Sequence, residues 1–274
     1  MSSCMEVRVV DKTDVTARLI IEDVDVPFMN ALRRIMLVEV PSMVIDEIVV
    51  LENSSILHDE IMAHRLGLVP LKTDLDSYNL PEECPCKSEF GCNLCRVTLT
   101  LDVEATDSVR TVYSGDLVPS NPDIIPVSEK IPLVKLAPSQ RVRLEAYARL
   151  GKGIEHAKWQ PVSGCVYKYF PKIKINQQAC DACGKCVEIC SKRVLTNVGK
   201  KVEIRNITGC TLCQDCVDAC AKDPTAIEAS WDQDAFILDV ESSGGLPVER
   251  ILLEAVKILD GKAENFLKLL MEKK

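Results

Sequence analysis

The sequence predicts an α+β protein of two or three domains, and three features of the chain support this prediction. Several segments alternate apolar and polar residues, as half-buried strands do. Two others, one near the start and one at the end, place apolar residues at helical spacing. Between them, a cysteine-rich stretch repeats itself after 30 residues. With 274 residues, of which 47% are hydrophobic, the chain is long enough to bury more than one core.

The first elements are predicted to be a hairpin and a helix. Residues 7–21 alternate around the turn-like sequence DKTD, which is typical of a half-buried antiparallel hairpin. Pro27 suits the first turn of a helix that Pro41 would end. Asp25 or Val26 would cap this helix.

The middle of the chain is predicted to hold a second sheet. Residues 42–55 are rich in β-branched side chains and predict a strand, followed by a short helix in 56–70. Residues 96–106 and 140–153 alternate strictly and predict two further strands. Two proline-containing stretches are expected to be loops: residues 71–95 and 118–132.

A long helix is predicted over residues 246–274, with Pro247 near its start and Gly261 weakening its middle. Its large apolar surface suggests a partner, although packing on the chain's own sheet is the plainer explanation.

The charge of the chain argues against binding to a phosphate backbone. The formal net charge is −8, whereas such binding depends on Lys and Arg. Residues 172–224 differ, with nine basic and six acidic residues, but no aromatic residue lies among them. An ordinary solvated surface is therefore favoured over a nucleic-acid site. The sequence shows no apolar run of membrane-span length and no secretory signal, so we expect a soluble cytosolic protein.

Cysteine is the most informative residue type. Fourteen cysteines in a reducing cytosol favour metal ligation over disulfides. Twelve of them fall into three groups, whereas Cys4 and Cys165 stand alone and are expected to be small buried hydrophobes.

Two of the groups share the spacing CxxCxxCxxxC, over residues 180–190 and 210–220. In two-cluster ferredoxins, three such thiolates hold one four-iron cluster and the fourth cysteine ligates the other cluster. The pattern predicts two [4Fe–4S] clusters with crossed ligands. The first would take Cys180, Cys183, Cys186 and Cys220, and the second Cys210, Cys213, Cys216 and Cys190. Two zinc ions are the competing interpretation. The proline that usually follows the fourth cysteine is replaced by Ser191 and Ala221.

The third group is predicted to hold one structural zinc ion. Its members lie in a single loop: Cys84, Cys86, Cys92 and Cys95. Four thiolates complete a tetrahedral zinc site and leave no position open for substrate. The alternative is four reduced thiols, which an exposed loop would readily oxidise.

Other catalytic patterns are incomplete. His58 and His64 lie six residues apart, so a helix would point them to different faces. Residues 151–153 read GKG, which is better explained by a tight turn than by a phosphate loop. No Ser/His/Asp set and no cluster of aspartates for catalytic magnesium is apparent.

Three stretches outside the repeat carry a family resemblance: NALRRIMLVEVPSMVIDEI, ILHDEIMAHRLGLVPL and GKGIEHAKWQPV. Together they resemble the D-subunit family of archaeal DNA-directed RNA polymerase. This family is related to the N-terminal domain of the bacterial alpha subunit and to the third-largest subunit of eukaryotic polymerase II. The resemblance covers nearly the whole chain. Some archaeal members carry a ferredoxin-like insert, and relatives hold zinc where Cys84, Cys86, Cys92 and Cys95 stand.

The resemblance implies an alpha-subunit-like dimerisation domain built from both chain ends, residues 1–46 and 225–274. It implies an inserted, mainly β domain with the cysteine loop (47–171) and a ferredoxin-like two-cluster module (172–224). The chain would then be non-catalytic by itself and would pair with the small alpha-like subunit L. This heterodimer would be the platform for subunits N and P and the large catalytic subunits, with little or no direct DNA contact.

Seven residues are candidates for these contacts. Phe28, Leu32, Ile35, Ile258 and Phe266 would meet subunit L, and Arg33 and Arg34 would face a large subunit. The alternative function is a ferredoxin-type electron-transfer subunit of an oxidoreductase. It is disfavoured because its partner motifs are missing and the cysteine module is net basic.

Overall fold

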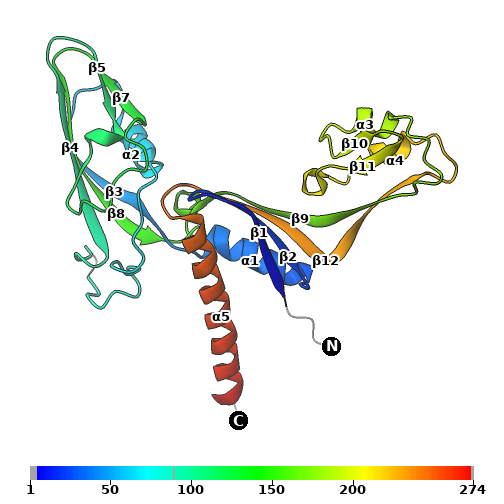
Figure 1. Ribbon diagram of the computed structural model, residues 1–274. Helices are drawn as coiled ribbons and strands as arrows, with labels where there is room; N and C mark the ends of the chain where they lie inside the picture. Colours follow the sequence, from blue (N-terminus) through cyan, green and yellow to red (C-terminus); the bar gives the residue numbers. More distant parts are fainter. Residues whose placement is uncertain (1–4, 89, 273–274) are drawn as a thin grey trace. The chain divides into compact units, whose positions relative to one another are not determined.

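The protein is described here by a computed structural model that covers residues 5–88 and 90–272 (Figure 1). It divides into two compact units. Unit 1 comprises residues up to 11, 18–29 and 166–239, and unit 2 comprises 12–17, 30–165 and the residues from 240 onward. The elements in chain order are β1 (Glu6–Lys12), β2 (Thr16–Glu22), α1 (Val26–Val38), β3 (Ser42–Asn53), α2 (Asp59–Gly67), β4 (Arg96–Ala105), β5 (Arg110–Tyr113), η1 (Ser114–Asp116), β6 (Val118–Pro119), β7 (Pro132–Leu136), β8 (Gln140–Gly151), η2 (Ala157–Trp159), β9 (Val162–Ile175), α3 (Lys185–Ile189), β10 (Leu195–Val198), β11 (Lys201–Ile204), η3 (Ile207–Gly209), α4 (Asp215–Asp218), β12 (Ile227–Ser242) and α5 (Val248–Glu272).

Unit 1 contains most of a four-stranded sheet with the order β1-β2-β12-β9. The predicted hairpin is present, but β1, an edge strand, is exposed on both faces along its whole length. The long strands β9 and β12 were not predicted. β12 buries the consecutive residues 235–238, and Tyr167 and Tyr169 of β9 pack on Phe236 with ring centroids 5.8 and 5.1 Å away.

The cysteine repeat forms a small module within unit 1 (Figure 1). It contains the antiparallel pair β10–β11 and the short helices α3 and α4. Its buried core consists of Leu195, Val202 and Ile227, with cysteine side chains packed around them. So small a core contributes little of the free energy that this segment needs in order to fold.

Unit 2 contains the second four-stranded sheet, with the order β3-β8-β4-β6. The three predicted strands are confirmed and pair antiparallel, with Val44 opposite Arg149 and Leu101 opposite Leu144. Their inward-facing residues form one core with Met62 and Leu66 of α2. The stretch 118–132, predicted to be a loop, is mostly loop: it contains the two-residue strand β6, the first residue of β7, and Pro126, which bridges to Leu71 after α2.

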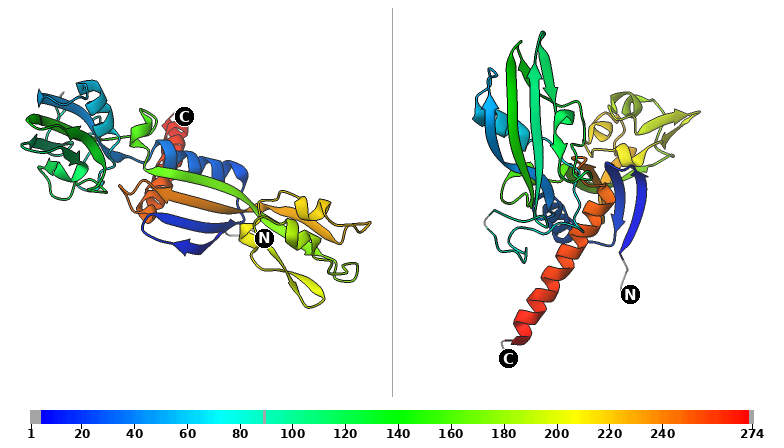
Figure 2. Two further views of the ribbon diagram at one scale, coloured as in Figure 1. Left: turned by 90° about the horizontal axis from the view of Figure 1, so that it is seen from above. Right: turned by 90° about the vertical axis from the view of Figure 1, so that its left-hand side faces the viewer.

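The two longest helices begin and end close to the predicted positions. The carboxylate of Asp25 accepts a hydrogen bond from the N–H of Phe28 at 2.9 Å, so Asp25 caps α1. Along α5, only Val248, Ile251 and Ala255 are buried. The half of α5 that follows Gly261 is exposed throughout, although Lys262 forms an ion pair with Glu39, just after α1 (Figure 2). None of the described helices combines the length and the apolar character needed to cross a membrane.

Two glycines give a direct test of packing in unit 2. A methyl group on Gly151 would lie 2.4 Å from Cε2 of Trp159, whereas one on Gly261 would meet nothing within 4 Å. We expect Gly151→Ala to lower the free energy of unfolding by about 1–3 kcal/mol through overpacking. Gly261→Ala should raise it by about 0.5–1 kcal/mol by favouring the helix. Urea denaturation followed by tryptophan fluorescence measures both, and equal stability of the two variants would contradict the packing around Trp159.

Candidate metal centres

The loop between α2 and β4 brings the four cysteines of the third group together. The sulfur atoms of Cys84 and Cys92 are 3.7 Å apart, and those of Cys86 and Cys95 are 3.9 Å apart. All four sulfurs lie within 4.8 Å of one another, and Cys84 and Cys95 are buried. A tetrahedral zinc ion with Zn–S bonds of about 2.3 Å places its sulfurs about 3.8 Å apart. The loop therefore fits one zinc-sized ion bound by four thiolates.

The local backbone favours thiolates at this site. The N–H of Cys92 donates to the sulfur of Cys95, and the N–H of Leu94 donates to that of Cys92. The N–H of Ser88 and the neighbouring thiol of Cys84 lower the pKa of Cys86 to about 7. The N–H of Cys86 favours the Cys84 thiolate, but burial and three neighbouring thiols outweigh it and raise the pKa of Cys84 to about 12.

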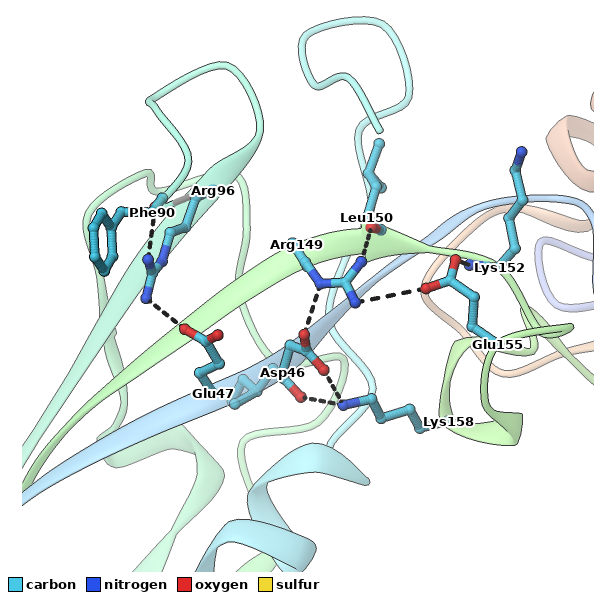
Figure 3. A network of polar contacts seen from close by, with 10 residues as sticks. Asp46, Glu47, Phe90, Arg96, Arg149, Leu150, Lys152, Glu155 and Lys158 are labelled. Carbon is cyan, nitrogen blue, oxygen red and sulfur yellow. Dashed lines mark hydrogen bonds and ion pairs between the residues drawn. The ribbon is translucent and has the colours of Figure 1, made fainter. Parts of the chain in front are cut away.

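Arg96 attaches this loop to the outer face of the sheet (Figure 3). Its guanidinium donates to the carbonyl of Phe90 at 2.6 Å and to the carboxylate of Glu47 at 3.0 Å. The same group lies 3.7 Å from the ring centroid of Tyr147. Arg96 directly follows the last ligand, so these contacts fix the loop end that carries Cys95.

A second polar network, centred on Asp46, lies beside the first (Figure 3). Its carboxylate accepts from Arg149 and from Lys158, each at 2.6 Å. Burial raises the pKa of Asp46, but these two hydrogen bonds outweigh it and lower the pKa. Both cations also lie over the ring of Trp159, at 4.6 and 4.4 Å. Sequence reasoning assigned no role to these residues, because nothing in their local pattern identifies their partners.

The cysteine repeat forms two further groups of thiols. Cys180, Cys183, Cys186 and Cys220 line a cavity of about 150 Å³. Cys190, Cys210, Cys213 and Cys216 line a smaller hollow of about 20 Å³. Each group combines three cysteines of one motif with the fourth cysteine of the other, as crossed ligation requires. We call them the first and the second site.

The two motifs also share a backbone conformation. Ala182 and Leu212 occupy equivalent positions and have φ of 56° and 58°. Gly184 and Gln214 also occupy equivalent positions, and they have φ of 84° and 70°. Because left-handed backbone costs a non-glycine residue about 1–2 kcal/mol, the shared conformation needs a compensating interaction, which a bound metal group would supply.

The spacing of the thiols distinguishes these sites from the zinc-sized loop. In the part of the chain that the structure describes, Cys84, Cys86, Cys92 and Cys95 form the only set of potential ligands that lie within 4.8 Å of one another. In this structure the thiols of the first and second sites are therefore more widely spaced than the four thiols of the loop.

The seven predicted interface residues differ in accessibility. Leu32 and Ile35 are buried within this chain, and their role in a partner contact stays a prediction. Phe28, Arg33 and Ile258 are half-buried, and Arg34 and Phe266 are exposed.

The remaining predicted residues are placed as follows. Cys165 is buried, as expected for a small hydrophobe, and burial raises its pKa to about 11. Cys4 lies outside the described residues. His58 and His64 are exposed, before and within α2.

Comparisons with known proteins agree with one another. The family profile described as the RNA polymerase Rpb3/Rpb11 dimerisation domain matches residues 18–263. The chain is 40% identical over 271 residues to "DNA-directed RNA polymerase subunit Rpo3" of Methanosphaera stadtmanae, covering 98% of this chain and 99% of that protein. It is 38% identical over 267 residues to the protein of that name from Archaeoglobus fulgidus, covering 97% and 98%. The Methanothermobacter thermautotrophicus protein is 40% identical over 264 residues, covering 95% and 97%.

The cysteine loop predicts a specific pH dependence of zinc binding. Zinc displaces protons from thiols, so its affinity should fall by about tenfold per pH unit for each proton displaced. Below the Cys86 pKa of about 7, this thiol also has to lose a proton, so the decline should become steeper. Chelator competition between pH 8 and 6 measures the effect.

Cys86→Ser is the matched variant for this measurement, because serine does not ionise in this range. The variant should bind zinc more weakly and should lose the additional steepness below pH 7. An unchanged pH profile in Cys86→Ser would argue against Cys86 as a ligand.

Proposed function

The chain belongs to the Rpb3/Rpo3 family of RNA polymerase subunits, and we propose that it is an assembly subunit that forms a heterodimer with the small subunit L. It is not catalytic alone, and its contribution to transcription is positional. The alternative function, an electron-transfer subunit of an oxidoreductase, has no support among these relatives.

The observation that carries the proposal is the uncovered apolar surface of α5. Its large exposed side chains are Leu253, Val256, Phe266, Leu267, Leu269, Leu270 and Met271. Several recur at intervals of three and four residues, so they lie along one side of the helix. An apolar helical stripe of this kind binds in a groove or against the helices of a partner.

The other proposed contacts of the complex involve α1 and the middle of α5. Phe28 and Ile258, both half-buried, would extend the contact with subunit L. Arg33 and Arg34 would face a large subunit. Subunits N and P would join the same platform in the cytoplasm. The net charge of −8 is consistent with a position away from DNA.

We also propose that the first and second sites hold [4Fe–4S] clusters and that the loop of residues 84–95 holds zinc. The crossed grouping of the thiols and their wide spacing support the clusters. The sulfur distances near 3.8 Å support zinc. In all three places the metal would have a structural role.

The partner contact can be tested with charges on α5. The double change Ile258→Asp and Phe266→Asp should abolish co-elution with subunit L in size-exclusion chromatography after co-expression. Burying a carboxylate in an apolar contact costs several kcal/mol. Ile56→Asp places a charge on another strongly exposed apolar residue and should leave co-elution unchanged. A stable heterodimer of the double variant would contradict the proposed interface.

The crossed ligation can be tested with single cysteine changes. Two four-iron clusters predict about eight irons per chain in anaerobic preparations. Cys190→Ser should perturb the cluster held by Cys210, Cys213 and Cys216, and Cys183→Ser should perturb the other one. Iron analysis and electron paramagnetic resonance distinguish the two losses. Two zinc ions in place of iron, or loss of the same cluster in both variants, would refute the assignment.

A further inference from the structure

Two side chains attach the second site to the sheet of unit 1: Lys168, and Gln214, whose amide donates to the carbonyl of Ala229 on β12 at 2.9 Å. Lys168 lies on β9, and its ammonium donates to the carbonyl of Thr208 and to that of Cys210, both at 2.8 Å. Cys210 is the first ligand of the second site, and Thr208 belongs to η3, the turn that leads into it. The half-buried side chain of Lys168 thus links the sheet to the backbone of the loop that carries ligands of the second site.

Lys168 is also the last member of a row of charges across three strands. Arg18 of β2 donates to the carboxylate of Asp239 on β12 at 2.5 Å. Asp239 attracts the ammonium of Lys168, and Arg18 repels it. Because β2, β12 and β9 are consecutive in the sheet, the row runs from the hairpin side of the sheet to the second site.

The first site has different attachments. The ion pair beside it joins Lys222 to Asp181 at 2.8 Å, and both residues belong to the module. Gln177, just before its ligands, donates to the carbonyl of Val202, which is also in the module. The first site also meets the ends of two sheet strands directly, since Ile175 of β9 and Ile227 of β12 line its cavity.

We propose that Lys168 is a positioning residue that holds the ligand loop of the second site on the sheet, so that loss of metal from the second site reaches the middle of β9 and β12 through this lysine. This inference rests on the proposed clusters. When the second cluster leaves, the strained backbone at Leu212 and Gln214 is free to relax, and the carbonyls of the loop move. Lys168 then loses two charge-assisted hydrogen bonds, and the attraction of Asp239 is opposed by the repulsion of Arg18. Its ammonium has to turn toward water, and β9 and β12 shift with it.

The experiment uses the full chain, loaded anaerobically with iron and sulfide, in a Cys183→Ser background that leaves only the second cluster. Lys168→Met should speed release of iron to a chelator by about tenfold, because it removes two hydrogen bonds to a charged donor. Lys168→Arg keeps a charged donor and should restore the rate to within about threefold. Lys222→Met removes a lysine beside the other site and should leave the rate unchanged.

Hydrogen exchange provides a readout that general destabilisation would not reproduce. In the protein that retains Lys168, iron loss should speed amide exchange in residues 166–170 and 235–239 by about tenfold or more, as local unfolding does. In Lys168→Met, iron loss should change exchange only within the module. Amide exchange in unit 2 shows whether Lys168→Met is folded. If it is not folded, Lys168→Gln takes its place. Because Lys168→Gln keeps one neutral donor, it should give an intermediate rate of iron release.

The outcomes separate the two proposals. The first outcome is that the chain without the Cys183→Ser change holds about eight irons, while Lys168→Met alters neither the rate of iron release nor the exchange response. This outcome would overturn the role of Lys168 alone. Absence of iron would overturn the clusters and this inference together. If Lys222→Met accelerates iron release as much as Lys168→Met does, the effect is due to lost surface charge. This result would also overturn the role of Lys168.

Discussion

The smallness of its hydrophobic core is the constraint on which the fold of the repeat module depends. Some fifty residues close around a core cluster of three buried aliphatic side chains, whereas the core of unit 2 contains many more. At Ala182, Leu212 and Gln214 the module also holds non-glycine residues in left-handed backbone, which hydrophobic burial of this extent does not offset. The metal–thiolate bonds that we propose would supply the missing free energy, since binding of a structural metal is itself a contribution to folding. The strands β9 and β12 enter and leave this module, so its integrity also determines how their outer ends are held.

The cysteine loop of unit 2 solves a similar problem by a different route. Its four sulfurs already lie at the spacing of a single tetrahedral ion, and the surrounding backbone donates hydrogen bonds to two of them. Arg96 holds the loop on the sheet by one ion pair, one carbonyl and one aromatic ring. Contacts within the protein thus hold the loop in the geometry of a single tetrahedral ion, whereas the repeat module would depend more on the metal groups that we propose for it. The two kinds of proposed site would then differ in how far their folds depend on metal.

Local patterns in the sequence predicted the local structure well. Strict alternation identified β4 and β8, the carboxylate of Asp25 identified the start of α1, and cysteine spacing identified the three groups of thiols. The strand β12 was missed because residues 235–238 are buried one after another, which removes the alternation that marks a half-buried strand. Contacts between distant residues were also missed. Neither the pairing of Asp46 with Lys158 nor that of Lys168 with Cys210 leaves a local signal, because each depends on how far-apart segments come together. The burial of Leu32 and Ile35 within the chain was missed for the same reason. The predicted domain boundaries are untested by the two compact units and stay a prediction.

The exposed half of α5 has a consequence for the amount of this protein that a cell can maintain. A free chain displays several large apolar side chains on the half of α5 in which every described residue is exposed. Such a surface favours self-association, and a single unsupported helix opens readily enough for proteases to cut it. A chain made in excess of its partner should therefore have a short lifetime, and a paired chain a long one. Supply of the partner would then set the cellular level of this protein, with no dedicated regulator needed.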